Sequence, residues 1–115
     1  MLQFEELKLR LIAHEEELAN LAEALGPEKM KTEIANLEEQ QAQEGFWDDI
    51  QNSQKVLQRT SVLKNKVSAY ERLKADYDDA LVMIELADEE EDESLVDECT
   101  QGVEKFEKDL DAQTL

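Results

Sequence analysis

Apolar residues recur along most of this chain at alternating steps of three and four, the spacing that places them on one side of an α-helix. In the first such run they are Phe4, Leu7, Leu11, Leu18, Leu21 and Leu25, with His14 in the same series. The pattern predicts an all-α fold of about four helices, at roughly residues 2–25, 27–43, 49–87 and 93–112. The third helix is predicted to be the longest, at roughly 57 Å from about Ile50 to Ala87 for a rise of 1.5 Å per residue.

The first predicted helix should end at Gly26-Pro27. Glycine suits the position after a helix, and proline suits the first turn of the next one. Because so few residues separate the two helices, either an antiparallel hairpin or a kinked continuous rod is compatible with the sequence.

The second break, Gly45-Phe46-Trp47-Asp48-Asp49, combines a helix stop with a helix start. Gly45 can adopt the left-handed conformation, and either Asp48 or Asp49 can cap the following helix; Asp48 with Gln51 matches the capping-box pattern. We expect Phe46 and Trp47 to be buried and to hold a chain reversal. Replacing a buried Trp47 by alanine should then cost roughly 3–5 kcal/mol.

Short joints between heptad-patterned segments favour an elongated helical bundle with coiled-coil character. By length, residues 1–115 form a single domain. The segment 88–93 consists of six acidic residues, and it is predicted to be a solvated turn before the last helix, with a weak cation site or a site for a basic partner as the alternative.

The net negative charge of the chain makes some classes of partner unfavourable. The chain has 12 basic and 30 acidic residues and a formal net charge of −18. Such a surface repels phosphates, so we expect no direct binding of nucleic acid and none of anionic membranes. No secretion signal and no apolar run of membrane-spanning length occurs, so a cytoplasmic location is the expectation.

Histidine and cysteine, which often act in catalysis and metal binding, occur only once each in the chain. We predict no catalytic, cofactor-binding or metal site. A di-metal bundle requires two Glu-x-x-His pairs, whereas the chain has one histidine, His14, preceded three positions earlier by Leu11. We interpret His14 as a packed or boundary residue of the helix seam, with partner contact and metal binding as alternatives. Cys99, Tyr70 and Tyr77 are interpreted as core residues, with exposed partner-binding aromatics as the alternative for the two tyrosines. The partner-binding residues of the chain are otherwise unknown.

The chain from about Leu25 onward resembles the N-terminal helical domain of the bacterial release factor 2 family, class-I peptide chain release factors that read stop codons on the ribosome. The matching segments are Ile34-Ala35-Asn36-Leu37-Glu38-Glu39, Gly45-Phe46-Trp47-Asp48-Asp49, Gln54-Lys55-Val56, Tyr70-Glu71-Arg72-Leu73 and Ile84-Glu85-Leu86-Ala87-Asp88-Glu89-Glu90. At Ile50 the family commonly has proline.

The resemblance implies an N-terminal domain fragment of a longer factor that terminates translation. The family's Gly-Gly-Gln loop for peptidyl-tRNA hydrolysis and its Ser-Pro-Phe codon-reading tripeptide do not occur in this sequence. By resemblance, the partners are the ribosome, at the GTPase-associated region of its stalk base, and the class-II release factor GTPase. The alternative is a free-standing acidic coiled-coil adaptor that binds basic proteins.

Overall fold

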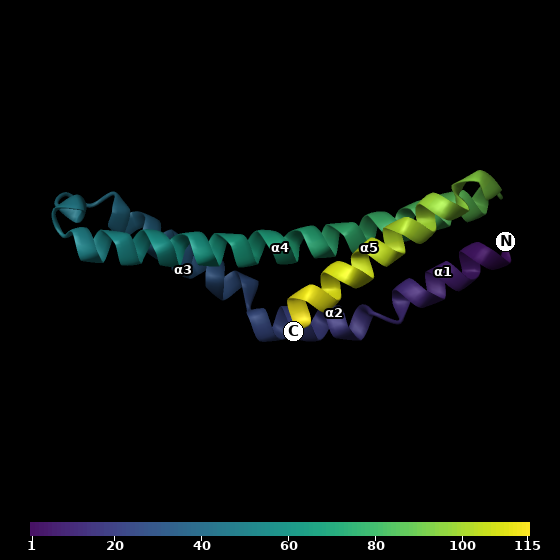
Figure 1. The fold of residues 1–115 in the computed structure, drawn as a ribbon, viewed down its shortest axis with the longest axis horizontal. Coiled ribbons are helices and arrows are strands. Elements are labelled where there is room, and N and C mark those ends of the chain that lie inside the picture. Colours follow the sequence, from purple (N-terminus) through teal and green to yellow (C-terminus); the bar gives the residue numbers. More distant parts are fainter. The chain divides into compact units, whose positions relative to one another are not determined.

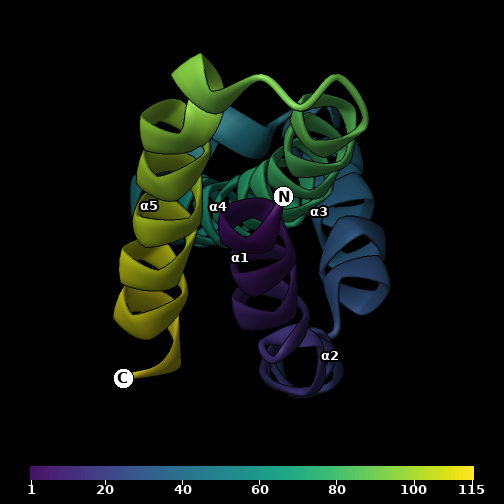
Figure 2. The same cartoon turned by 90° about the vertical axis from the view of Figure 1, so that its right-hand side faces the viewer.

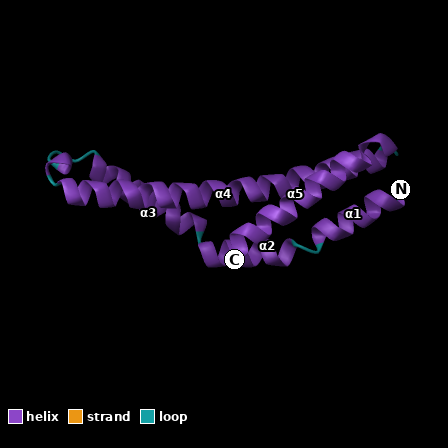
Figure 3. Cartoon of the chain, viewed as in Figure 1, coloured by secondary structure: helices purple, strands orange, loops and turns teal.

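The computed structural model describes residues 1–115, and its regular elements are all helices (Figures 1 and 3). The all-α prediction is therefore confirmed. The elements in chain order are α1 (Leu2–Ile12), α2 (Glu15–Leu25), α3 (Pro27–Gln41), the 3₁₀ helix η1 (Phe46–Asp48), α4 (Ile50–Glu89), the 3₁₀ helix η2 (Glu93–Leu95) and α5 (Val96–Thr114). Five α-helices thus replace the predicted four. The elongated form and the coiled-coil character stay predictions.

The additional helix arises because the segment predicted as one helix over 2–25 is interrupted at Ala13 and His14. At this point the His14 N–H donates to the Leu11 carbonyl three residues back, and regular α-helical bonding resumes only in α2. Arg10 lies in the last turn of α1, and Glu15 opens an acidic first turn of α2. These charges complement the dipoles of two separate helix ends, so they stabilise the interruption.

The chain divides into two compact units, each with its own buried side chains. One unit consists of Met1–Ala24 together with Arg72–Leu115, and the other of Leu25–Glu71. The helix α4 supplies residues to both. The prediction of a single domain over 1–115 stays a prediction.

In the unit Leu25–Glu71, α3 pairs with the first part of α4 in the antiparallel sense. The Gln41 side-chain amide donates to the Thr60 hydroxyl at 3.0 Å, while Lys31 lies 3.8 Å from Glu71, so positions later in α3 face positions earlier in α4. The core of this unit contains Ile34, Leu63 and Val67, with Met30 and Leu37 packed against them.

The other unit buries the seams of α1, α2 and α5 together with the second part of α4. Figure 2 shows α1 and α5 side by side, and the two helices are in direct contact. Phe106 of α5 is fully buried, with its ring centroid 5.4 Å from Tyr77 and 6.0 Å from His14. The remaining core side chains are Phe4, Leu7, Leu11, Leu18, Leu73, Ile84, Ala87, Cys99, Val103 and Leu110.

The long helix α4 keeps the predicted seam inside. Buried positions advance by alternating steps of three and four from Ser53 to Val67. Two successive steps of three then lead through half-buried Tyr70 to buried Leu73. A step of three in place of four rotates the buried stripe about the helix axis. This shift falls where α4 passes from one compact unit to the other.

Candidate functional site

The joint before α4 is built on the left-handed conformation of Gly45, whose φ is +83°. The Asp49 carboxylate accepts a hydrogen bond from the Asn52 backbone N–H at 3.1 Å and thereby caps α4. Of the two aspartates that the sequence offered as caps, Asp49 fills the role. Gly26, with φ of +63°, and Pro27 at the start of α3 confirm the other predicted break.

Trp47 is largely exposed, and the expectation that it is buried is wrong. Its side chain keeps 62% of its accessible surface, whereas the neighbouring Phe46 is buried. The two rings meet edge to face at 4.9 Å and 89°. The physical reason is the 3₁₀ turn η1, in which successive side chains point about 120° apart, so one ring can enter the core while the next faces solvent.

Ile50, at the first position of α4, is also 67% exposed. Two large apolar side chains, Trp47 and Ile50, therefore lie at the surface within four residues of each other. We call them the exposed joint pair. Tryptophan is among the residue types that contribute most to protein–protein binding.

His14 lies half-buried at the interruption between α1 and α2, against Phe106. Its Nε2 is 2.8 Å from Glu107, and its Nδ1 is 3.2 Å from Glu17. Burial lowers the pKa of the imidazole, but the hydrogen bonds to the Glu107 and Glu17 carboxylates outweigh it and raise that pKa above its ordinary value. The interpretation as a packed or boundary seam residue is confirmed, and the ring links Glu17 of α2 to Glu107 of α5.

Arg10 completes this cluster by donating to the same Glu107 carboxylate from α1. The Arg10 hydrogen bond, followed by the one from His14, lowers the pKa of Glu107 in spite of its partial burial. The cluster is a structural link, because the Glu107 carboxylate already accepts hydrogen bonds from both Arg10 and His14.

The interpretation of Cys99 and Tyr77 as core residues is confirmed, while Tyr70 is half-buried. Burial raises the pKa of the Cys99 thiol, and Glu98 raises it further. A thiol of this kind is a poor nucleophile. The Tyr77 hydroxyl donates to the Glu15 carboxylate at 2.7 Å, and burial together with this bond raises the pKa of the phenol.

The acidic segment 88–93 is shared between elements. Its first two residues complete α4, and the backbone then turns through Glu91, whose φ is +50°. Asp92 accepts hydrogen bonds from the Ser94 backbone and hydroxyl, and Asp88 accepts one from the Met1 amino group.

No group of His, Cys, Asp or Glu side chains in the structure is arranged to hold a metal ion. None of the helices combines the length and apolar character that a membrane span requires.

Comparison with known proteins assigns the chain to a family. Residues 30–115 match the PCRF domain, and the chain belongs to the family defined by that domain. The matched region contains α3 from its fourth residue, the exposed joint pair, α4 and α5.

Two relatives are each described as peptide chain release factor 2. The protein from Acidothermus cellulolyticus is 36% identical over 101 residues, which is 85% of this chain and 27% of the relative. The protein from Staphylococcus saprophyticus is 30% identical over 110 residues, covering 96% of this chain and 30% of the relative. The chain thus spans about three-tenths of the length of these curated relatives. No solved structure matches it.

Proposed function

We propose that this chain is the N-terminal helical domain of a peptide chain release factor, and that it positions the factor on the ribosome in the cytoplasm during termination. Its match to the PCRF domain, together with relatives described as release factor 2, carries this proposal. The partners proposed are the GTPase-associated region at the stalk base of the ribosome and the class-II release factor GTPase.

A positioning role without hydrolysis is consistent with the residues present. The chain contains neither Gly-Gly-Gln nor Ser-Pro-Phe. Its one histidine is held between two carboxylates, and its one cysteine is a buried thiol with a raised pKa. Peptidyl-tRNA hydrolysis is therefore proposed to depend on other parts of the factor.

The electrostatics favour protein partners over phosphates. Of the 12 basic residues, seven form ion pairs with carboxylates of the chain itself: Lys8, Arg10, Lys31, Arg59, Lys64, Lys74 and Lys105. A nucleic acid bound through its backbone would have to compete with these carboxylates for the cations. A basic ribosomal protein would instead meet a complementary surface, which increases the association rate and specificity.

The exposed joint pair is the contact that we propose for the unit Leu25–Glu71. Trp47 and Ile50 present apolar surface that this unit does not cover. An exposed tryptophan held edge-on by a buried phenylalanine is already oriented, so binding costs little side-chain entropy.

The experiment compares the full-length factor with a version lacking these residues, in peptide release from ribosomes programmed with a stop codon. At saturating factor we expect release to be retained, because the hydrolytic chemistry lies elsewhere. The half-saturating concentration should rise, since joining binding modules increases overall affinity by as much as about 10²–10⁴-fold. Engagement of the recycling GTPase should also be impaired.

The full-length Trp47→Ala variant provides the finer test. It should raise the half-saturating concentration without lowering the release rate at saturation, whereas Leu9→Ala, which truncates an exposed leucine on α1, should change neither value. Loss of release at saturation by the deletion variant, with the remaining domains folded and ribosome-bound, would show that this domain takes part in the chemistry and would refute the proposal.

A further inference from the structure

An apolar groove of about 410 Å³ lies along the C-terminal part of α4, within the unit that contains Arg72–Leu115. Its wall consists of Val82, Met83 and Leu86 of α4, its floor is the buried Ala87, and Leu95 of η2 closes one side. Val82 and Leu86 are 54% and 56% exposed. Large apolar side chains gathered along one groove at this exposure are typical of an interaction surface.

The spacing of the lining residues matches the footprint of a helix. Positions 79, 82, 83, 86 and 87 of α4 form one stripe at helical spacing, and Glu90, directly after the end of α4, continues it. The stripe is about 16 Å long at 1.5 Å per residue, or three helical turns. An amphipathic helix binds such a groove through apolar anchors at positions i, i+3 or i+4, and i+7.

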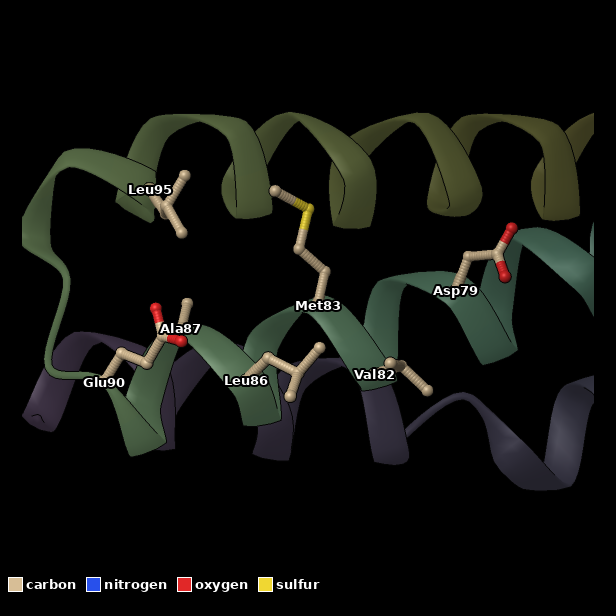
Figure 4. Close-up of a pocket in the computed structure, with 7 residues that line it drawn as sticks. All are labelled: Asp79, Val82, Met83, Leu86, Ala87, Glu90 and Leu95. Atoms are coloured by element: carbon tan, nitrogen blue, oxygen red, sulfur yellow. The ribbon is translucent and has the colours of Figure 1, made fainter.

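Acidic side chains bracket the apolar wall. Figure 4 shows Asp79 and Glu90 at opposite ends of the groove, with Met83 extending from α4 between them. No basic side chain lines the groove. The surrounding sequence adds to the negative charge around the groove, because residues 75–104 contain thirteen acidic residues and no lysine or arginine.

We propose that this groove binds a basic amphipathic α-helix of a partner protein. Three turns of that helix would place apolar side chains on Val82, Met83 and Leu86, and lysine or arginine near each end would face Asp79 and Glu90. The flexible thioether of Met83 can adapt to anchors of different shape. This inference does not rest on the proposed function, because it derives from the groove and its charge alone.

Charge also argues against a second copy of the chain as the occupant. With a net charge of −18, two copies repel each other, and acidic ends of one groove would meet acidic ends of the other. A helix that carries lysine or arginine at both ends relieves this repulsion.

The test uses a fluorescently labelled, 14-residue helical peptide with leucines at i, i+4 and i+7 and lysines toward both ends. A scrambled peptide of the same composition is the control, and binding to the 115-residue chain is measured by anisotropy. We expect the patterned peptide to bind at least tenfold more tightly than the scrambled one. Its affinity should fall as salt is raised, since exposed charges are screened.

Substitutions in the chain then locate the site. Leu86→Ser should weaken binding at least tenfold, while Leu9→Ser, which changes an exposed leucine on α1, should leave the affinity within twofold. Glu90→Lys should weaken binding and reduce its salt dependence. Because Leu86 is more than half exposed, its replacement should leave the circular dichroism of the chain unchanged.

Several results would overturn the inference. Equal affinity for the scrambled peptide would mean that charge alone drives binding, and an unchanged affinity of Leu86→Ser would place the site elsewhere. A dimer of the chain that Leu86→Ser dissociates would identify a second copy as the occupant. If the peptide bound the 115-residue chain but not the full-length polypeptide, another segment of the same polypeptide would be the occupant instead of a partner.

Discussion

Truncation of Phe106 tests how the unit formed by Met1–Ala24 and Arg72–Leu115 is held together. The Phe106 ring has no exposed surface and lies edge to face against both Tyr77 and His14. Phe106→Ala should therefore destabilise the chain by about 3–5 kcal/mol through lost burial and a residual cavity. Because each aromatic pair adds ~0.5–1.5 kcal/mol beyond burial, we expect the upper part of that range.

The free energy of unfolding is measured by urea titration followed by circular dichroism. A loss of this size is a large share of the roughly 5–15 kcal/mol that stabilises a typical domain. Phe106→Leu, which keeps most of the apolar volume, should cost clearly less. Leu9→Ala removes a side chain that is 69% exposed and should change the free energy by no more than about 0.5 kcal/mol.

Hydrogen exchange shows where the loss occurs. In Phe106→Ala, amides of α1, α2, α5 and the second part of α4 should exchange faster, while those of α3 keep most of their protection, because Phe106 belongs to only one of the two compact units. A destabilisation below about 1 kcal/mol would refute the packing of Phe106 against Tyr77 and His14, since removal of a buried ring in contact with two others costs more free energy than this. An equal loss of protection in α3 would contradict the division of the buried side chains between two units.

Three further measurements follow from individual residues. Because the pKa of His14 is raised in the folded chain, its contribution to stability should be complete below pH ~6.5 and be lost as the pH rises through the folded-state pKa. His14→Gln should flatten this decline in stability, and the same pH profile in the variant and the parent chain would contradict the prediction. The fluorescence of Trp47 should be red-shifted and readily quenched by iodide, because the ring is largely exposed. Trp47→Ala should lower the free energy of unfolding by only ~1 kcal/mol, the contribution of the contact between Trp47 and Phe46. Blue-shifted emission would mean that the ring is buried. Gly45→Ala should cost about 1–2 kcal/mol because φ is +83°. Gly102→Ala should instead stabilise the chain by up to ~1 kcal/mol, because in the middle of α5 an added Cβ has no atom within 4 Å beyond its adjoining residues and its own helix backbone. Equal effects of the two substitutions would show that the backbone at Gly45 is not strained for alanine.

Local features of the sequence determined most of the secondary structure. The periodic apolar positions predicted the helices, because a side chain three or four residues away lies on the same face whatever the rest of the fold does. The breaks at Gly26 and Gly45 were also predictable, since only glycine adopts positive φ without steric cost. Burial of Cys99 and Tyr77 followed from the same periodicity.

Tertiary contacts decided the features that periodicity could not specify. The apolar series runs unbroken through His14, yet the helix stops there, where the imidazole reaches Glu107, 93 residues further along the chain. The charges of Arg10 and of the acidic turn beginning at Glu15 were the available signal for that interruption.

At the joint, sequence alone placed two aromatic residues between two helices but did not determine which ring is buried. The direction in which η1 leaves Gly45 turns Phe46 inward and Trp47 outward. Likewise, the groove on α4 exists because η2 places Leu95 beside Val82, Met83 and Leu86. Helix spacing is set by neighbouring residues, whereas exposure depends on which distant segments cover a face, and only the folded chain brings those segments together.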